Sequence, residues 1–542
     1  MSLLSRVLER VARLPPARTR AVTVRHDIPV TMPDGVTLLT DRYRARDDGA
    51  EPIILMRSPY GRGGIHALAA RLFAERGYQV VVQSCRGTFG SGGTFNAYRD
   101  EATDGLATLD WLEAQAWSKG KIAMFGPSYL GIAQWAVATD PPPALRALAP
   151  AISSARVRTF TYTAGSFSLD STLTWLSLLA SQQHRGLRRL RDQLDGAKRQ
   201  ARGFATSPLS EADLAVTGER VPFYQDWLSR KDDDAFWAPV EFERHLDSVA
   251  VPVTMVSGWY DMFLPAQLAD FRALREAGHD ARITIGPWKH ADPGLAGEGV
   301  RDALDWFGVH LGGGSTRLRS PVRIFVGGSR RWLDLDDWPP PSRPARWHLQ
   351  PAGGLHVRPG GPGPPDRYRY DPADPTPSVG GSLLARGGPR DNRALERRAD
   401  VLVYTSAALM RDVEAIGPVT AELFVRSTLA HADFFVRVCD VDPSGHSRNI
   451  CDGLVRLTPE QWSPGPDGVS PVNVNLWPMA HVFRRGHRIR VQVSSGAHPR
   501  FARNLGGGEP FGTATTMRSA DQEVWHDVDH PSAIVLPARD PS

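Results

Sequence analysis

The sequence predicts an α/β domain with a parallel sheet, a helical insertion within that domain, and an all-β domain after it. Short apolar segments alternate with helical patterns over residues 21–150 and again over 249–338, which is typical of a parallel sheet buried on both faces. Residues 151–248 lose this alternation and show mainly helical, polar patterns. Residues 339–542 begin with a proline-rich link and continue with short alternating strands between turn signals. That pattern indicates a β-sandwich, and we expect one of the jelly-roll type.

Residues 1–20 form an N-terminal extension in which arginines alternate with leucines and valines at helical spacing. The pattern predicts a short amphipathic helix and lacks the uninterrupted apolar core of a signal peptide. The chain has no run of about 18 apolar residues, the length that a membrane-spanning helix needs. Lys and Arg total 64 against 59 Asp and Glu, a net charge of +5 without a concentrated basic stripe. We therefore expect a cytoplasmic protein without a membrane span and without a nucleic-acid partner.

The first α/β stretch opens with two antiparallel strands around the turn Met32-Pro33-Asp34-Gly35 and continues with parallel strands and helices. The strands are predicted at 22–29, 36–43, 52–56, 78–82 and 122–125, and the helices at 66–76, 101–115 and 132–138. The insertion is expected to hold helices near 173–180, 187–202 and 223–228, after which strands 251–256 and 281–285 resume around a helix at 266–277. The insertion is therefore interpreted as a cap over the catalytic edge of one α/β domain. In the last domain, strands are predicted at 421–425, 434–438 and 488–493.

Three cysteines, Cys85, Cys439 and Cys451, are too few and too scattered for a disulfide framework or a zinc site. Cys439 and Cys451 flank a turn, and a hairpin centred near Gly445 would make them face each other. A disulfide is then geometrically possible, but two reduced cysteines in a cytoplasmic protein are the preferred interpretation. HExxH and paired-cysteine motifs are absent from the sequence, so we expect neither a metal nor a cofactor.

The stretch Gly126-Pro127-Ser128-Tyr129-Leu130-Gly131 follows an apolar strand and precedes a helix. A serine at a sharp strand-to-helix turn is how an α/β-hydrolase exposes its nucleophile. The strained turn requires small residues nearby, and Gly126 and Gly131 meet that need. The backbone NH of Tyr129 can point at a developing oxyanion at the positive end of the helix.

A serine nucleophile needs a base and an acid that orients it, in the chain order Ser, Asp, His. Asp261 follows the strand that resumes at 251, and His290 follows the next one. Taken singly, a loop aspartate is more often a helix N-cap, here for the helix near Ala266, and a loop histidine more often faces solvent. Because all three residues follow successive strands in the correct order, the joint interpretation as a catalytic triad is favoured.

Tyr60 follows the strand at 52–56, in the region where hydrolases place a second oxyanion donor. Its hydroxyl could reach back over the sheet; otherwise Tyr60 is a packed loop aromatic.

Several motifs together resemble the cocaine esterase / X-Pro dipeptidyl-peptidase family of serine hydrolases, which includes the α-amino-acid ester hydrolases. They are Arg57-Ser58-Pro59-Tyr60-Gly61, Arg86 to Gly93, the Ser128 stretch, Gly258-Trp259-Tyr260-Asp261, Gly286-Pro287-Trp288-Lys289-His290, Tyr370 to Pro375 and Pro478 to Ser495. The resemblance covers nearly the whole chain. It implies a hydrolase core at 21–150 and 249–338, a helical cap at 151–248 and a jelly roll at 339–542.

The resemblance also implies roles for single residues. Ser128 is the nucleophile, His290 the base, Asp261 its orienting acid, and the Tyr60 hydroxyl and Tyr129 NH the oxyanion donors. Trp175 and Phe263 match positions that line the acyl pocket in cocaine-esterase-like members, with core packing as the alternative at even odds.

The substrate expectation rests on a departure from the family's pattern. The α-amino-acid ester hydrolases carry extra carboxylates for the substrate ammonium, and one place to look is the stretch after the catalytic aspartate. Here residues 262–266 contain no acid, and an apolar pocket holds a free ammonium only at high cost. We therefore expect an esterase for small-molecule esters, with amides as a further class and an uncharged acyl group.

Two rival functions remain open. An X-Pro dipeptidyl peptidase needs an acid for the N-terminal ammonium, and Asp170 and Glu241 are available by sequence. A non-catalytic binding protein on a jelly-roll scaffold would have no use for a triad with oxyanion donors. Because jelly rolls can mediate assembly, a homo-oligomer is a possible state.

Overall fold

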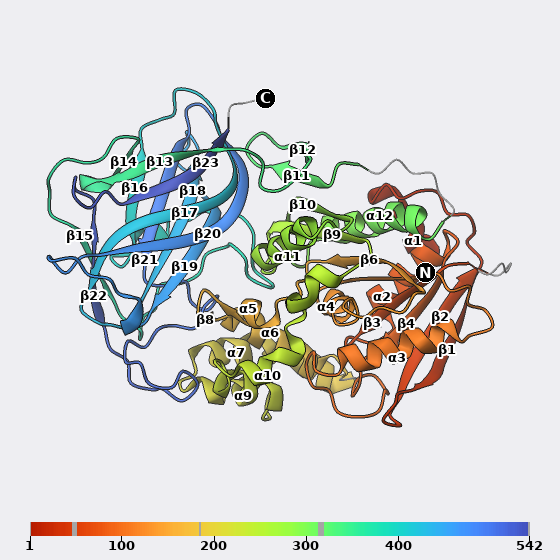
Figure 1. Ribbon diagram of the computed structural model, residues 1–542. Coiled ribbons are helices and arrows are strands. Elements are labelled where there is room, and N and C mark those ends of the chain that lie inside the picture. Colours follow the sequence, from red (N-terminus) through yellow and green to blue (C-terminus); the bar gives the residue numbers. More distant parts are fainter. Residues whose placement is uncertain (1, 46–50, 184–185, 313–318, 540–542) are drawn as a thin grey trace.

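The computed structural model describes residues 2–45, 51–183, 186–312 and 319–539. Its first domain is a sheet with the strand order β1-β2-β4-β3-β5-β6-β9-β10-β11-β12 (Figure 1). These strands are β1 Val22–Thr31, β2 Thr37–Ala45, β3 Ile53–Ser58, β4 Gln79–Ser84, β5 Ile122–Pro127, β6 Leu145–Ala151, β9 Val253–Tyr260, β10 Ala281–Lys289, β11 Val322–Val326 and β12 Arg331–Leu335. From β4 to β11 neighbouring strands are parallel, whereas β1, β2 and β12 pair antiparallel.

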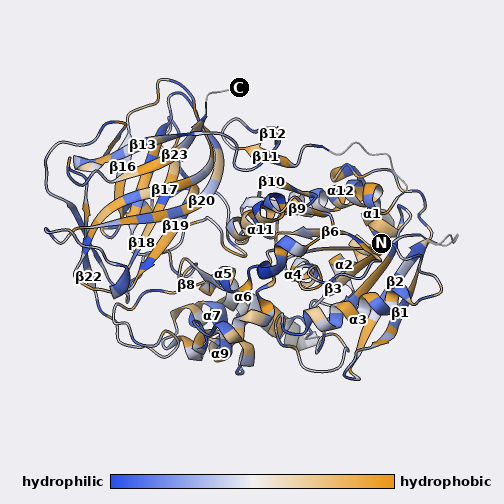
Figure 2. Cartoon of the chain, in the orientation of Figure 1, coloured by the Kyte–Doolittle hydropathy of each residue, from blue (hydrophilic) through white to orange (hydrophobic). Residues whose placement is uncertain are grey.

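Helices cover both faces of this sheet, as the apolar strands predicted. They are α1 Ser2–Val11, α2 Gly64–Ala74, α3 Glu101–Glu113, α4 Tyr129–Trp135, α11 Leu264–Glu276 and α12 Pro293–His310. Alternate residues of one strand enter different cores: Ile53 and Leu55 pack with α3 and α11, whereas Ile54 and Met56 pack with α2 and α12. Figure 2 shows the central strands as mostly hydrophobic, which is the burial on both faces that a parallel sheet requires.

The segment between β6 and β9 forms a mainly helical cap beside the carboxyl ends of the parallel strands (Figure 1). Its elements are α5 Val157–Thr161, β7 Tyr162–Thr163, β8 Ser166–Phe167, α6 Leu169–Ser181, α7 Gly186–Ala205, α8 Ala212–Thr217, α9 Pro222–Ser229 and α10 Asp234–Trp237, with 3₁₀ turns at Leu209–Glu211, Ala238–Val240 and Phe242–Ser248. The helices predicted near 173–180, 187–202 and 223–228 are α6, α7 and α9. Buried apolar residues of this segment join the same core as α3 and α11.

The C-terminal part is a β-rich domain around its own apolar core. Its strands are β13 Arg343–Gln350, β14 Gly354–His356, β15 Asp366–Tyr370, β16 Leu402–Ser406, β17 Val413–Ser427, β18 Ala432–Val441, β19 Ser447–Leu457, β20 Ser470–Phe483, β21 Arg488–Ser494, β22 Ala520–Trp525 and β23 Ala533–Arg539, with 3₁₀ turns at Pro351–Gly353, Leu395–Arg397 and Pro459–Gln461. None of the helices in the described part of the chain is long and apolar enough to cross a membrane.

The prediction that Cys439 and Cys451 face each other is wrong. Both cysteines are buried and free, and a β-bulge shifts the pairing of β18 with β19, so that Cys451 lies opposite Val438 and Cys439 lies opposite Asn449. Because a shift of one residue moves a side chain to the other face of a sheet, Cys451 enters the domain core while Cys439 contacts Gln492.

Candidate active site

Ser128 lies at the sharp turn between β5 and α4. Its backbone has φ 56° and ψ −123°, a conformation that costs a non-glycine residue ~1–3 kcal/mol. A Cβ on Gly126 would lie 2.2 Å from Cβ of Leu130, and one on Gly131 would lie 2.4 Å from Cβ of Ser153. The small residues predicted around Ser128 are therefore required, and the strained turn brings its hydroxyl to the carboxyl edge of the sheet.

The structure brings Ser128, His290 and Asp261 together at this edge. Oγ of Ser128 lies 3.1 Å from Nε2 of His290, whose Nδ1 lies 2.7 Å from Oδ2 of Asp261. Asp261 is fully buried, and its Oδ1 accepts the backbone NH of Phe263 at 2.8 Å. One oxygen of Asp261 thus holds the turn before α11 and the other faces the histidine, while the N-cap residue of α11 is Phe263.

Tyr129 anchors the Ser128 turn to the interior of the domain. Its hydroxyl donates to Oε1 of Glu101 at 2.9 Å and accepts the backbone NH of Tyr98 at 3.1 Å. Glu101 also accepts from the buried guanidinium of Arg57 at 2.5 Å. Tyr129 is the first residue of α4, so its backbone NH lies in the first turn, where helix NH groups lack partners within the helix.

Tyr60 lies after β3 and its hydroxyl accepts the indole NH of Trp175 at 2.9 Å. An indole NH can only donate, so the phenolic proton of Tyr60 is free to point elsewhere. Burial raises the pKa of Tyr60, and Ser128 is among the groups that interact with its hydroxyl. The phenol therefore keeps its proton at neutral pH beside the serine.

A cavity of about 50 Å³ opens next to Ser128 and is lined mainly by aromatic and apolar side chains. Trp175 and Phe263, which the sequence suggested, both line it. The lining residues are Tyr60, Tyr98, Ser128, Tyr129, Ile132, Phe160, Thr161, Ser171, Thr172, Trp175, Trp227, Met262, Phe263, His290 and Leu384. Of the lining residues that the structure describes, none is Asp, Glu, Lys or Arg.

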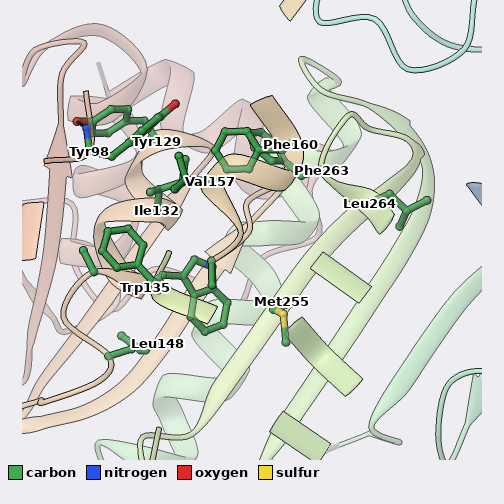
Figure 3. Close-up of a cluster of buried hydrophobic side chains, with 14 of the residues drawn as sticks. Tyr98, Tyr129, Ile132, Trp135, Leu148, Val157, Phe160, Met255, Phe263 and Leu264 are labelled. Atoms are coloured by element: carbon green, nitrogen blue, oxygen red, sulfur yellow. Dashed lines mark hydrogen bonds between the residues drawn. The ribbon is translucent and has the colours of Figure 1, made fainter. Parts of the chain in front are cut away.

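Aromatic rings form the walls of this cavity. Tyr98 is nearly parallel to Trp175 and Trp227, with ring centroids 5.9 Å away in each case. Phe160 meets Phe263 edge-on at 4.8 Å, and Phe263 lies 5.7 Å from the ring of His290. Figure 3 shows Tyr98 beside Tyr129 and Phe160 beside Phe263.

The two carboxylates proposed as ammonium partners lie in different places. Oδ2 of Asp170, at the start of α6, accepts the backbone NH of Leu384 at 2.9 Å. Asp170 lines a neighbouring cavity of about 20 Å³ that shares Phe160, Ser171 and Met262 with the main one. Glu241 pairs instead with Arg244 and Arg158 and lines neither cavity.

Sequence reasoning missed Tyr98, Trp227 and Leu384 as lining residues. Tyr98 has φ 69°, a backbone state that no local motif reveals. The sequence predicts a helix around Trp227 but gives no sign that its side chain lines a cavity. Leu384 comes from the stretch between β15 and β16 of the C-terminal domain. Contacts across such sequence separations leave no local signal.

Comparisons with known proteins agree with this architecture. Residues 34–292 match the family model of the X-Pro dipeptidyl-peptidase (S15 family), and residues 316–535 match its C-terminal non-catalytic domain. The cocaine esterase of a Rhodococcus species is 33% identical, over 95% of this chain and 98% of its own.

Two solved structures share the fold. The crystal structure of an aminopeptidase from a marine sediment archaeon (Thaumarchaeota) has a TM-score of 0.82 at 24% identity, over 96% of this chain and 97% of its own. An α-amino acid ester hydrolase has a TM-score of 0.81 at 22% identity, over 97% of this chain and 98% of its own. The motifs and both family models lead to one conclusion: the chain belongs to the family of serine hydrolases that includes cocaine esterase and the X-Pro dipeptidyl-peptidases.

Proposed function

We propose that the protein hydrolyses carboxylic esters, and amides as a further class, through an acyl-enzyme on Ser128. The observation that carries this proposal is the hydrogen-bonded row Ser128–His290–Asp261, which ends in a cavity without a charged lining residue among those described. A serine hydroxyl is a weak nucleophile until a positioned base accepts its proton.

In this mechanism Ser128 Oγ attacks the ester carbonyl while Nε2 of His290 takes the hydroxyl proton. Asp261 accepts from Nδ1 and thereby keeps Nε2 free as the base. The oxyanion is held by the Tyr60 hydroxyl and the Tyr129 NH, each a donor that needs no rearrangement. His290 then protonates the leaving alkoxide, and in the second half it activates the water that releases the acid.

The substrate class follows from the lining of the cavity. A substrate ammonium placed among Trp175, Trp227, Phe160 and Phe263 would lose its hydration without gaining a carboxylate partner, at a cost of several kcal/mol. An uncharged acyl group would bury apolar surface against the same rings at ~25 cal/mol per Å². We therefore infer a preference for small uncharged acyl groups, aromatic or aliphatic.

An X-Pro dipeptidyl peptidase is the second candidate function, because Asp170 lies beside the cavity. Burial raises the pKa of Asp170 above its ordinary value. The hydrogen bond from the Leu384 NH and the charges of Arg500 and Arg386 act in the opposite direction but do not cancel this rise. A substrate ammonium that extended from the main cavity past Ser171 and Met262, which line both cavities, would meet the carboxylate of Asp170. A peptidase would then depend on Asp170, whereas the esterase would not.

Matched substrates separate the two functions. Wild type, Ser128→Ala and Asp170→Asn would be assayed with p-nitrophenyl benzoate and butyrate and with Gly-Pro-p-nitroanilide, with Glu241→Gln as the matched control. We expect ester turnover that is lost only in Ser128→Ala, and no cleavage of the dipeptide anilide. Preferential cleavage of the anilide that disappears in Asp170→Asn would favour the peptidase, and activity that survives Ser128→Ala would contradict the nucleophile assignment.

A further inference from the structure

A second cavity, of about 310 Å³, lies at the end of the sheet opposite to the candidate active site. Arg282 is at the start of β10, whose other end leads to His290. Arg323 on β11 and Arg301 on α12 face the same space, together with Arg13 and Arg319. Figure 1 shows α1 beside α12 in this part of the molecule, and the Ala12 carbonyl accepts from Arg301 at 3.1 Å.

Five guanidinium groups line this cavity against two carboxylates, those of Glu298 and Asp305. Glu298 is already occupied, because it accepts from Arg301 and from Arg319. Asp305 has a partner of its own.

The acids just outside the cavity wall offset part of the excess of positive charge in the lining. Asp302, buried behind the wall, pairs with Arg319. Asp334, half exposed, lies 4.0 Å from Arg323.

Arg282 carries the buried donors of this cluster, while the charges of Asp305 and Asp280 act on it. It is only 4% exposed, and neither its Nε nor its Nη2 has a hydrogen-bond partner among the described residues. The guanidinium lies over the ring of Trp306, at 4.3 Å from the centroid. A buried donor without an acceptor costs ~1–3 kcal/mol, and more when it is charged, so Nε and Nη2 of Arg282 favour an acceptor placed in this cavity.

The pKa values of the cluster agree with this geometry. Burial lowers the pKa of Arg282 to about 10. Burial and the positive charges of Arg282, Arg323 and Arg301 lower the pKa of Arg319 to about 9. An anion placed between these groups would reverse the repulsion and satisfy the free donors.

We propose that this cavity binds an oxyanion of the phosphate type that carries at least two negative charges. Guanidinium groups present planar, paired donors that match phosphate oxygens. The volume lies at the lower end of the range for small-molecule sites, which suits a diphosphate, either free or carried by a nucleotide. Arg282 lies at the start of β10, whereas His290 of the candidate active site follows the other end of the same strand.

Isothermal titration with pyrophosphate and with ADP, at constant ionic strength, tests the proposal on the full chain. The variants are Arg282→Gln and Arg323→Gln, the second because Arg323 is one-third exposed and its loss is tolerated more easily. Arg369→Gln is the matched control, an exposed arginine of the C-terminal domain that pairs with Asp521.

We expect wild type and the control to bind pyrophosphate with one site per chain, and both cavity variants to bind at least tenfold more weakly. Equal binding of ADP would identify a nucleotide-borne diphosphate as the ligand, and binding of pyrophosphate alone would identify the free anion. Absence of binding by wild type, or an affinity unchanged by both cavity substitutions, would overturn the proposal.

Discussion

The two walls of the candidate active site are held in place by different forces. The polar wall, formed by Ser128, His290, Asp261 and Tyr60, is held by directed hydrogen bonds of 2.7 to 3.1 Å. The aromatic wall, formed by Tyr98, Phe160, Trp175, Trp227 and Phe263, is held by ring contacts at 4.8 to 6.3 Å.

The different forces in the two walls suit two different tasks, catalysis in the polar wall and selection of the substrate in the aromatic wall. Hydrogen bonds fix atoms in direction, which the transfer of a proton and the binding of an oxyanion require. Stacked rings offer area and shape but little direction, and so in the proposed function they would discriminate among acyl groups. We therefore expect changes in the polar wall to affect all substrates alike and changes in the aromatic wall to alter the ratio between substrates.

The largest effect is expected for Ser128→Ala. Without the hydroxyl no acyl-enzyme forms, so kcat/KM should fall at least ~10⁴-fold for the benzoate and butyrate esters alike. Initial rates on both esters measure this, with circular dichroism to show that the variant is folded. A loss of activity on only one ester would contradict the proposal that the polar wall affects all substrates alike.

Tyr60→Phe is expected to come next, because it removes one of two oxyanion donors while the ring remains. Loss of such a donor costs ~10²–10³ in kcat. The control is Tyr98→Phe, which removes a hydroxyl from the same cavity and should change kcat by only a few-fold. Equal losses of kcat in the two variants would mean that the Tyr60 hydroxyl is not an oxyanion donor and that Tyr60 contributes only by packing.

Phe263→Leu tests the aromatic wall. The smaller side chain enlarges the cavity next to His290, and the Phe263 NH that holds Asp261 is backbone and stays. The ratio of kcat/KM for benzoate over butyrate should rise about tenfold, since one methylene in an apolar pocket changes selectivity ~10-fold or more. A uniform fall for both esters would assign Phe263 to the polar wall.

Trp175 belongs to both walls, since its ring stacks in the cavity and its indole NH donates to Tyr60. Trp175→Phe keeps a ring and loses the donor. Because a neutral hydrogen bond contributes ~0.5–1.5 kcal/mol, we expect kcat to fall up to ~10-fold with little change in KM. The matched control is Trp227→Phe, which removes an indole from the same cavity. In the described part of the structure this indole makes no hydrogen bond with Tyr60, so kcat should stay nearly unchanged. Equal losses would show that the hydrogen bond from Trp175 to Tyr60 does not matter.

The polar wall could largely be predicted from the sequence, and the aromatic wall only in part. Ser128, Asp261 and His290 each follow an apolar strand at a turn, so local pattern and chain order together located them. Trp175 on α6 donates to Tyr60 across 115 residues, and no spacing rule connects a helix and a loop so far apart.

Other features depend on details that local patterns do not carry. The bulge in β18 and β19 that separates Cys439 from Cys451 depends on packing in the sheet. The burial of Nε and Nη2 of Arg282 depends on how α12 and β11 pack around β10.

The most direct test of the account is labelling with a fluorophosphonate probe, followed by peptide mapping. We expect one equivalent of adduct per chain on the peptide that contains Ser128, with ester hydrolysis abolished in proportion to labelling. We expect no adduct in Ser128→Ala. Labelling of another residue that abolishes activity, or full ester hydrolysis after Ser128 has been labelled, would contradict it.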